Sequence, residues 1–212
     1  MADYKTILQA VETEIEIKKS RFLNFTFHVE NEEDVEAVLT ELHKKHYKAT
    51  HICWAYVLNT TPLRQKATDD GEPAGTAGKP ILEVINHQEL KDVLVVVIRY
   101  FGGIKLGTGG LVRAYSGGAA DVIKASQLIK KQFSSQIYIE IIYPLYGGLI
   151  NHLTEKNLLP VSESFEDKVT LFFQIPEADT QGFLEWITEE TNGQFEWRQE
   201  APDYVNVLLR DC

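Results

Sequence analysis

Apolar and polar residues alternate near the start of the chain, and their period of two over Val11–Lys18 predicts a half-buried β-strand. A second strand, rich in aromatic residues, is expected over Arg21–Val29. Apolar residues then recur at helical spacing from Val35 to Leu42, behind Asn31 as a helix N-cap. The opening segment therefore predicts two strands followed by a helix.

The middle of the chain predicts two further strands on either side of a polar loop. Ile52–Leu58 reads as a strand, and the apolar, largely β-branched run at Val93–Tyr100 is typical of a strand covered on both faces. Between them, Asn59–Gly78 is rich in Thr, Gly and Pro, which predicts an exposed loop that leads into a helix. The glycine-rich stretch Gly102–Gly110 then precedes a helix over Leu111–Ala125, where small residues favour close packing.

The rest of the chain follows a different order of elements. Strand, helix, strand, strand, helix and strand are expected over residues 137–142, 145–157, 159–165, 169–175, 179–190 and 195–209. This βαββαβ order is that of a ferredoxin-like domain. Because 212 residues are enough for two domains, the sequence predicts an α+β protein with domains at 1–133 and 134–212.

Charge is unevenly distributed between these two domains. Residues 1–133 carry 17 basic and 17 acidic side chains, whereas residues 134–212 carry 4 basic and 14 acidic ones, which accounts for the whole net charge of −10. An acidic domain repels phosphate backbones, so unspecific nucleic-acid binding there is disfavoured and DNA is not an expected partner. A local basic surface on the first domain is compatible with these counts.

Composition also argues against several classes of protein. No apolar run exceeds seven residues, far short of the ~20 that a membrane span needs, and the N-terminus lacks the pattern of a secretion signal. Cys53 and Cys212 give neither a disulfide framework nor a metal-ligand spacing. We therefore expect a cytoplasmic protein with no membrane contact, no metal and no cofactor.

The glycine-rich stretch is the most unusual feature of the sequence. Five glycines within nine positions follow a buried strand and precede a helix, so backbone N–H groups can point into one hollow. The helix N-terminus adds partial positive charge, and Lys105 and Arg113 add full charges, which favours binding of an anion. The alternative is that the glycines only permit a tight turn and close packing, since the segment matches neither the Walker nor the dinucleotide pattern. The candidate residues are Gly102, Gly103, Lys105, Gly107, Thr108, Gly109, Gly110 and Arg113.

A second group of candidates lies in the preceding loop, where three carboxylates stand among three cations: Arg64, Lys66, Asp69, Asp70, Glu72 and Lys79. One interpretation is a recognition loop that closes over the glycine-rich stretch, and another is a divalent-ion site with oxygen ligands. A third is a plain turn in which Asp69 and Asp70 accept backbone N–H bonds and Thr76 caps the next helix. Upstream, His51 and Cys53 share a strand face, which fits a thiol nucleophile or half a metal site. Core packing is the favoured interpretation of that pair.

Three segments of the chain resemble the defining motifs of one family. Thr68–Gly78 and Val97–Tyr115 look like the two long motifs of the IMPACT family in its bacterial YigZ branch, and His51–Tyr56 is similar to a shorter third. Ile52 departs from that third motif, where the family often has a polar residue. The resemblance implies an N-terminal domain folded like the second domain of ribosomal protein S5, which also occurs in domain IV of elongation factor G and in the ribonuclease P protein. It further implies a ferredoxin-like C-terminal domain similar to domain V of that elongation factor.

The resemblance also implies a link to translation, because the eukaryotic relative restrains the starvation-activated kinase of initiation by competing for its activator. We expect a non-catalytic binding protein that contacts the ribosome, structured RNA or a translation-related protein. The cations expected to contact RNA phosphate or an acidic protein surface are Arg64, Lys66, Lys79, Arg99, Lys105 and Arg113. One alternative is an enzyme or sensor that binds a small phosphorylated ligand at 102–110, with a carboxylate of the preceding loop as base or metal ligand. Another is a protein-interaction module that uses the acidic C-terminal domain.

Overall fold

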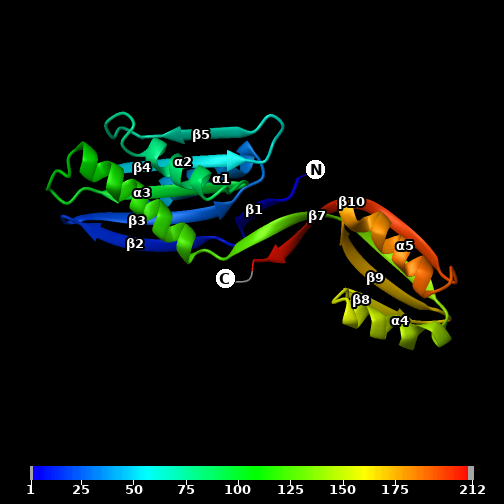
Figure 1. Ribbon diagram of the computed structural model, residues 1–212. Coiled ribbons are helices and arrows are strands. Elements are labelled where there is room, and N and C mark those ends of the chain that lie inside the picture. Colours follow the sequence, from blue (N-terminus) through cyan, green and yellow to red (C-terminus); the bar gives the residue numbers. More distant parts are fainter. Residues whose placement is uncertain (1, 210–212) are drawn as a thin grey trace. The chain divides into compact units, whose positions relative to one another are not determined.

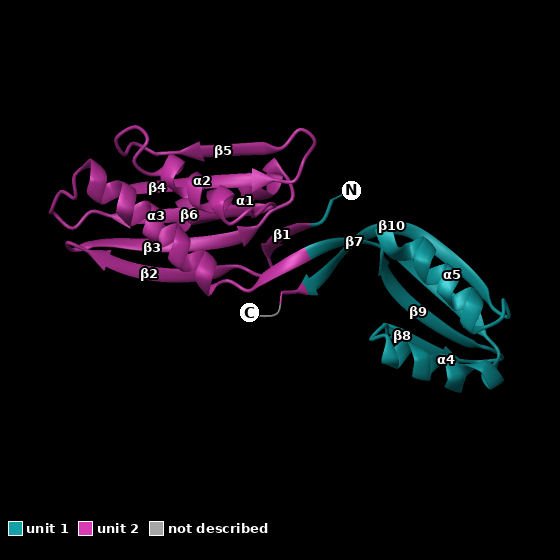
Figure 2. Cartoon of the chain, in the orientation of Figure 1, with its two compact units in different colours: residues 1–3, 131–207 teal, residues 4–130, 208–212 magenta. Residues whose placement is uncertain are grey.

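A computed structural model gives the structure of the chain and describes residues 2–209. The chain divides into two compact units, Tyr4–Lys130 and Lys131–Val207, which we call the N-terminal and C-terminal units (Figure 2). Residues 2–3 group with the C-terminal unit and residues 208–209 with the N-terminal unit. The α+β, two-domain fold class is confirmed, whereas the limits 1–133 and 134–212 stay a prediction. Cys212 lies outside the described residues.

The N-terminal unit is built on a five-stranded antiparallel sheet with helices on both faces (Figure 1). Its strands, in their order across the sheet, are β2 (Val11–Ile17), β3 (Ser20–His28), β6 (Val93–Tyr100), β4 (His51–Leu58) and β5 (Arg64–Thr68). Its helices are α1 (Glu32–Lys45), α2 (Gly78–His87) and α3 (Thr108–Ala125). One core lies between the sheet and helices α2 and α3, and a second lies between the sheet and α1.

The central strand β6 belongs to both cores, as its apolar run predicts. Val93, Val95 and Val97 pack on the side of α2 and α3, whereas the residues between them pack on the side of α1, and all are fully buried. Such runs are typical of parallel sheets. Here the sheet is antiparallel, and the run is explained by the helices that cover both faces.

The start of helix α1 is confirmed. The Asn31 side chain accepts the N–H of Asp34 at 2.8 Å, and acidic residues fill the first turn, where they offset the positive end of the helix dipole. The prediction of a continuous loop over Asn59–Gly78 is wrong, because β5 (Arg64–Thr68) lies within it. This strand is at the sheet edge and is mostly exposed, so it is held by main-chain pairing with β4 and leaves no apolar pattern in the sequence.

The C-terminal unit has the predicted ferredoxin-like topology. Its elements are β7 (Leu128–Ile141), α4 (Tyr143–Glu155), β8 (Ser162–Phe165), β9 (Val169–Pro176), the short 3₁₀ turn η1 (Glu177–Asp179), α5 (Thr180–Glu190) and β10 (Glu196–Leu208). The strand order β10–β7–β9–β8 is the one that a βαββαβ chain produces in this fold. Two features were not predicted: β7 begins nine residues early, at Leu128 within the N-terminal unit, and a short strand β1 (Tyr4–Ile7) of that unit pairs with β7.

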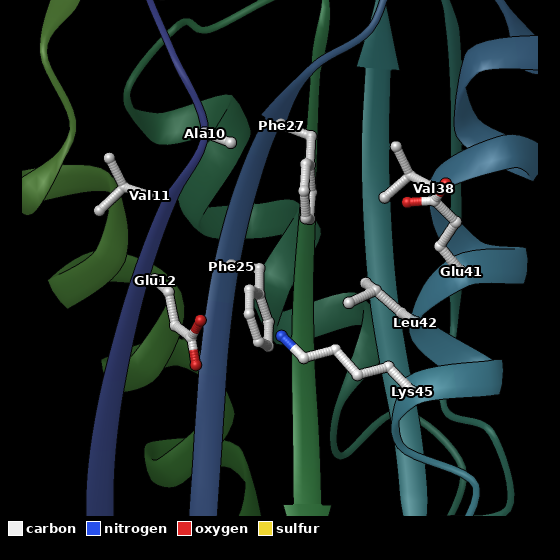
Figure 3. A pocket seen from close by; sticks show the side chains of 9 residues that line it. All are labelled: Ala10, Val11, Glu12, Phe25, Phe27, Val38, Glu41, Leu42 and Lys45. Carbon is white, nitrogen blue, oxygen red and sulfur yellow. The ribbon is translucent and has the colours of Figure 1, made fainter.

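A shallow pocket of about 340 Å³ lies where α1 leaves part of the sheet uncovered (Figure 3). Phe25 and Phe27 of β3 lie at its base, and the Lys45 side chain extends across it from α1 towards Phe25. None of the candidate functional residues predicted from the sequence lines this pocket. Among residues 2–209, no helix combines the length and the hydrophobicity that a membrane span requires.

Candidate anion-binding site

The two sequence motifs meet in the structure, as predicted. A pocket of about 370 Å³ lies between the loop after β5 and the glycine-rich loop that joins β6 to α3. In Figure 1 both loops lie at the same end of the N-terminal sheet. We call this the glycine-loop pocket, and it is lined by Glu72, Pro73, Arg99, Phe101, Lys105, Leu106, Gly107, Thr108 and Leu111.

One wall of the pocket is the N-terminus of α3. Gly107 is the N-cap and has φ +74°, a left-handed conformation that favours glycine. The first bond of the helix runs from the Leu111 N–H to the Gly107 carbonyl at 2.9 Å, so the N–H groups of Thr108, Gly109 and Gly110 have no acceptor within the helix. Among the described residues no side chain caps this end, and its first turn holds no acidic residue. The positive end of an 18-residue helix is therefore uncompensated at the pocket wall.

A buried arginine forms the base of the pocket. The Arg99 side chain is 6% exposed and lies near the rings of Phe22 and Phe101. Its Nη1 donates to Glu72 Oε1 at 2.7 Å and its Nη2 makes a long contact of 3.4 Å with Ser20 Oγ. Within residues 2–209 its Nε has no hydrogen-bond partner. A buried donor without an acceptor is costly, so Arg99 has an unused donor beside the pocket.

Glu72 neutralises this arginine. Its side chain is 3% exposed, and the same oxygen that binds Arg99 accepts the Tyr115 hydroxyl at 2.8 Å. His51 Nε2 lies 3.8 Å from the other oxygen. Burial, together with the neighbouring Cys53 and Glu72, raises the pKa of the Tyr115 hydroxyl well above its usual range, so this group stays a donor. Glu72 thus acts as a counter-ion within the fold.

Cys53 packs in the core, as the favoured interpretation held. Its side chain is fully buried, and its Sγ donates to the Asp69 carbonyl at 3.0 Å. Burial is the main cause that raises the pKa of the Cys53 thiol to about 12; a hydrogen bond with Tyr115 opposes this rise, and the nearby carboxylates contribute to it. A thiol of that pKa is protonated at neutral pH, so it is unsuited to nucleophilic attack.

Asp69 and Asp70 are occupied by backbone hydrogen bonds, which supports the interpretation of a turn. The Asp69 carboxylate accepts the N–H groups of Gly75, Ala77 and Gly78 at 2.8–3.0 Å. Burial by itself would raise the pKa of Asp69, but these three bonds outweigh it and lower the pKa below its usual value. Asp70 accepts the N–H of Ile52 at 2.6 Å.

The predicted cap of α2 was wrong in one respect. Thr76 donates to the Pro73 carbonyl at 2.7 Å, and the N-cap is Ala77, whose side chain makes no cap bond. Asp69 supplies the capping oxygen from earlier in the loop. Among residues 2–209 no group of three or more His, Cys, Asp or Glu side chains is placed to hold a metal ion. The divalent-ion interpretation of this loop therefore gains no support.

Other predicted residues line the pocket or lie in the segments next to it. Lys105 is exposed and lines it. The Arg113 guanidinium lies over the first turn of α3, because its Nη1 is 3.7 Å from the position that a Cβ atom on Gly109 would occupy. Gly102 abuts the β2–β3 turn, because a Cβ there would come within 1.9 Å of the Lys19 carbonyl oxygen. Gly103 is exposed and has φ +85°.

Arg64, Lys66 and Lys79 lie elsewhere. In the sheet register Lys66 pairs with Tyr56 of β4, whereas Arg99 pairs with His51 of the same strand. Tyr56 and His51 are five positions apart, so at about 3.3 Å per residue the two pairings are separated by about 17 Å along the sheet. Tyr56 also packs in the core on the side of α1, opposite the face that carries Phe22 and Arg99.

The contacts of these three cations are separate from the pocket as well. Arg64 lies 3.3 Å from Glu32, and Lys66 lies over the Trp54 ring. Lys79 lies 3.8 Å from Glu83, one turn along α2. Conversely, Ser20 and Phe22 of β3 contact Arg99 but were not predicted, since nothing in the sequence indicates that this strand passes beside β6.

Comparison with known proteins identifies the family to which this chain is similar. Residues 18–123 match the Impact N-terminal domain, and residues 139–194 match a domain of unknown function, DUF1949. The IMPACT family member YvyE of Bacillus subtilis is 38% identical over 206 residues, which cover 97% of this chain and 95% of that protein. YigZ of Escherichia coli is 32% identical and covers 85% of this chain and 90% of that one. Protein IMPACT of Danio rerio is 38% identical over 95 residues, 42% of this chain but only 29% of that protein.

Solved structures add to this picture. The crystal structure of a hypothetical protein is 30% identical, covers 93% of this chain and 97% of that chain, and has a TM-score of 0.62. The two-domain translational regulator Yih1 is 27% identical over 57% of this chain and 47% of that chain, with a TM-score of 0.36. With both units matched by domain models and full-length relatives above 30% identity, this chain belongs to the IMPACT family.

Proposed function

We propose that this chain is a non-catalytic binding protein of the translation apparatus, and that the glycine-loop pocket holds a phosphate group of RNA. The link to translation is supported by the family. The segment shared with a vertebrate protein IMPACT covers 42% of the chain, and the IMPACT resemblance implies a regulator of translation. The anionic ligand is supported by the pocket.

The observation that carries the proposal is that unused donors and an exposed cation meet in one pocket. The uncapped start of α3 and the exposed Lys105 line it, and so does Arg99, whose buried Nε has no partner among the described residues. A phosphate offers several acceptor oxygens and a charge that the helix dipole favours. Glu72 cancels the charge of Arg99, so the net attraction comes from Lys105, Arg113 and the helix.

The same pocket favours binding over catalysis. Its one carboxylate, Glu72, is engaged by Arg99 and Tyr115, and no histidine or cysteine is among the residues that line it. Cys53 lies nearby but is a buried thiol with a pKa of about 12. A general base needs a free proton acceptor within reach of the substrate, and a nucleophile needs an ionised form. Neither is supplied by the residues that line this pocket.

Binding of ribosomes and structured RNA over 50–200 mM salt tests the proposal. Affinity should fall steeply with salt, and Lys105→Glu and Arg113→Glu should each weaken binding and flatten the salt dependence by about one phosphate contact. Lys66→Glu is the matched control, because it makes the same charge change on the far part of the sheet. Binding that is insensitive to salt and to Lys105→Glu, or that Lys66→Glu weakens as much, would refute the proposal.

The size of the pocket favours a second candidate, a sensor of a small phosphorylated ligand. Its volume of about 370 Å³ falls within the range of small-molecule sites. A panel of nucleotides and sugar phosphates, with and without magnesium, should then raise the melting temperature of the wild-type chain but not of Lys105→Glu. No shift with any compound of the panel would remove this candidate.

A further inference from the structure

We infer that the RNA bound at the glycine-loop pocket is single-stranded, with an unpaired base against Phe101 and the neighbouring phosphates beside Lys18, Lys19 and Lys48. This inference rests on the proposed function and adds the class of RNA and its path. It starts from an exposed aromatic side chain. Phe101 lines the pocket and is 46% exposed, although a phenylalanine normally prefers burial.

The position of Phe101 is fixed on its inner side. The Arg99 guanidinium carbon lies 5.4 Å from the centre of its ring, and its backbone N–H donates to Thr50 Oγ1 at 2.9 Å. A nucleotide whose phosphate sits at the start of α3 would bring its base beside the exposed part of this ring. Stacking of a base on an aromatic ring is a main source of affinity for single strands.

Two lysines stand next to the pocket in the β2–β3 turn. Lys18 and Lys19 are exposed and have φ +48° and +64°, conformations that this kind of hairpin turn usually gives to asparagine and glycine. Such a backbone conformation is unfavourable for a residue with a Cβ. The turn is held against the glycine-rich loop, because the Gly102 N–H donates to Ser20 Oγ at 3.2 Å. Two cations are thus kept beside the pocket at a cost in backbone energy.

A third cation and a second aromatic ring lie in the segment after α1. Tyr47 is 75% exposed, and the Lys48 amino group lies 5.4 Å from the centre of its ring. This segment is tied to the same end of the sheet, since the Thr50 N–H donates to the Arg99 carbonyl at 2.8 Å. We call the surface formed by Lys18, Lys19, Tyr47, Lys48, Phe101, Lys105 and Arg113 the basic end surface.

Most acidic side chains at this end have partners within the fold. Glu72 is buried against Arg99, Asp69 and Asp70 accept backbone N–H groups, and Glu14 lies 2.7 Å from Arg21. Glu16 is exposed and stands opposite Arg21 in the β2–β3 register. The surface therefore attracts a phosphate chain locally, although the whole protein is acidic. Because a duplex keeps its bases stacked inside, only an unpaired strand can use Phe101 and Tyr47. The combination of a phosphate pocket, spaced cations and exposed rings favours single-stranded RNA.

Fluorescence anisotropy tests the inference. It compares a labelled single-stranded RNA of about 12 nucleotides, a length within the usual range for single-strand binding sites, with the duplex of the same sequence. The single strand should bind more tightly. Phe101→Ala should weaken its binding roughly 5-fold to 150-fold, the range for loss of one stacked base, and Phe101→Trp should retain it. Lys18→Glu combined with Lys19→Glu should weaken binding and flatten the salt dependence by about two contacts. The control is Arg64→Glu combined with Lys66→Glu, an equal charge change on β5.

Each variant must first show the circular dichroism and melting behaviour of the wild type. Duplex binding as tight as that of the single strand overturns the inference, as does unchanged binding in the Phe101 and Lys18/Lys19 variants. If either of these results is found but Lys105→Glu still abolishes binding, the phosphate pocket remains supported and only the proposed path of the single strand is wrong. If Phe101→Ala weakens binding and Lys105→Glu does not, the proposed pocket fails. An equal loss in the β5 control refutes both.

Discussion

Replacing Glu72 by glutamine is expected to destabilise the N-terminal unit, because the Arg99 guanidinium then stays charged and buried without its counter-ion. The two side chains are 3% and 6% exposed and meet at 2.7 Å, so the appropriate reference is a buried pair, for which loss of one partner costs about 3–5 kcal/mol. Glutamine preserves the shape and an acceptor for the Tyr115 hydroxyl, so the cost reflects the charge. The matched control is Glu83→Gln, which removes an exposed pair with Lys79 and should cost about 0.5 kcal/mol or less.

Urea unfolding followed by tryptophan fluorescence measures this difference. Trp54 is the one tryptophan of the N-terminal unit, so a chain with Trp186→Phe and Trp197→Phe reports on that unit alone. With a urea dependence of about 1–3 kcal/mol per molar, Glu72→Gln should lower the midpoint by on the order of 2 M. A shift no larger than that of Glu83→Gln would show that the pair does not stabilise the fold.

A double replacement separates stability from binding. Glu72→Leu combined with Arg99→Met removes both charges, and apolar replacement of a buried pair is often neutral or stabilising. We therefore expect the double variant to regain much of the stability that Glu72→Gln loses, while its affinity for RNA falls below that of the wild type because the Arg99 donors are gone. An RNA affinity of the double variant equal to that of the wild type would contradict the role given to Arg99.

Three further predictions concern the surrounding loops. Asp69→Asn should cost about 1–2 kcal/mol at neutral pH, because both carboxylate oxygens accept backbone N–H groups and the amide replaces one of them by a donor. The folded-state pKa of Asp69 is lowered, so the stability that it contributes is present above its unfolded pKa of ~3.9 and is lost as pH falls through the folded pKa. The wild type and the variant should therefore converge in acid unfolding curves. Gly102→Ala should destabilise by about 1–3 kcal/mol because its Cβ would overlap the Lys19 carbonyl, whereas Gly117→Ala, which meets nothing within 4 Å, should stabilise helix α3 by about 0.5–1 kcal/mol in the same denaturation assay. Because the Cys53 thiol is buried and protonated, it should react with iodoacetamide at pH 8 only after urea is added, as measured in a chain whose second cysteine is replaced by serine. Rapid labelling of the folded chain would contradict the burial of Cys53.

Local patterns in the sequence determined most of the elements. The apolar run of β6, the Asn31 cap of α1 and the βαββαβ order of the C-terminal unit follow from side-chain period, capping chemistry and element order, which neighbouring residues encode by themselves. The glycine-rich stretch between β6 and α3 could be identified as a hollow for the same reason, since its glycines and the following helix are adjacent in the chain.

The tertiary structure decided which distant residues meet. The sequence allowed Glu72 to be a metal ligand or a base, but in the fold it forms a buried ion pair with Arg99. The sequence also grouped Arg64 and Lys66 with the pocket, but both lie on β5 in another part of the sheet. In the same way, Lys19 lies beside Gly102 only because β3 pairs with β6. The physical reason is that strand register and helix packing are set by contacts across the whole unit, whereas a sequence pattern records only the surroundings of each residue along the chain.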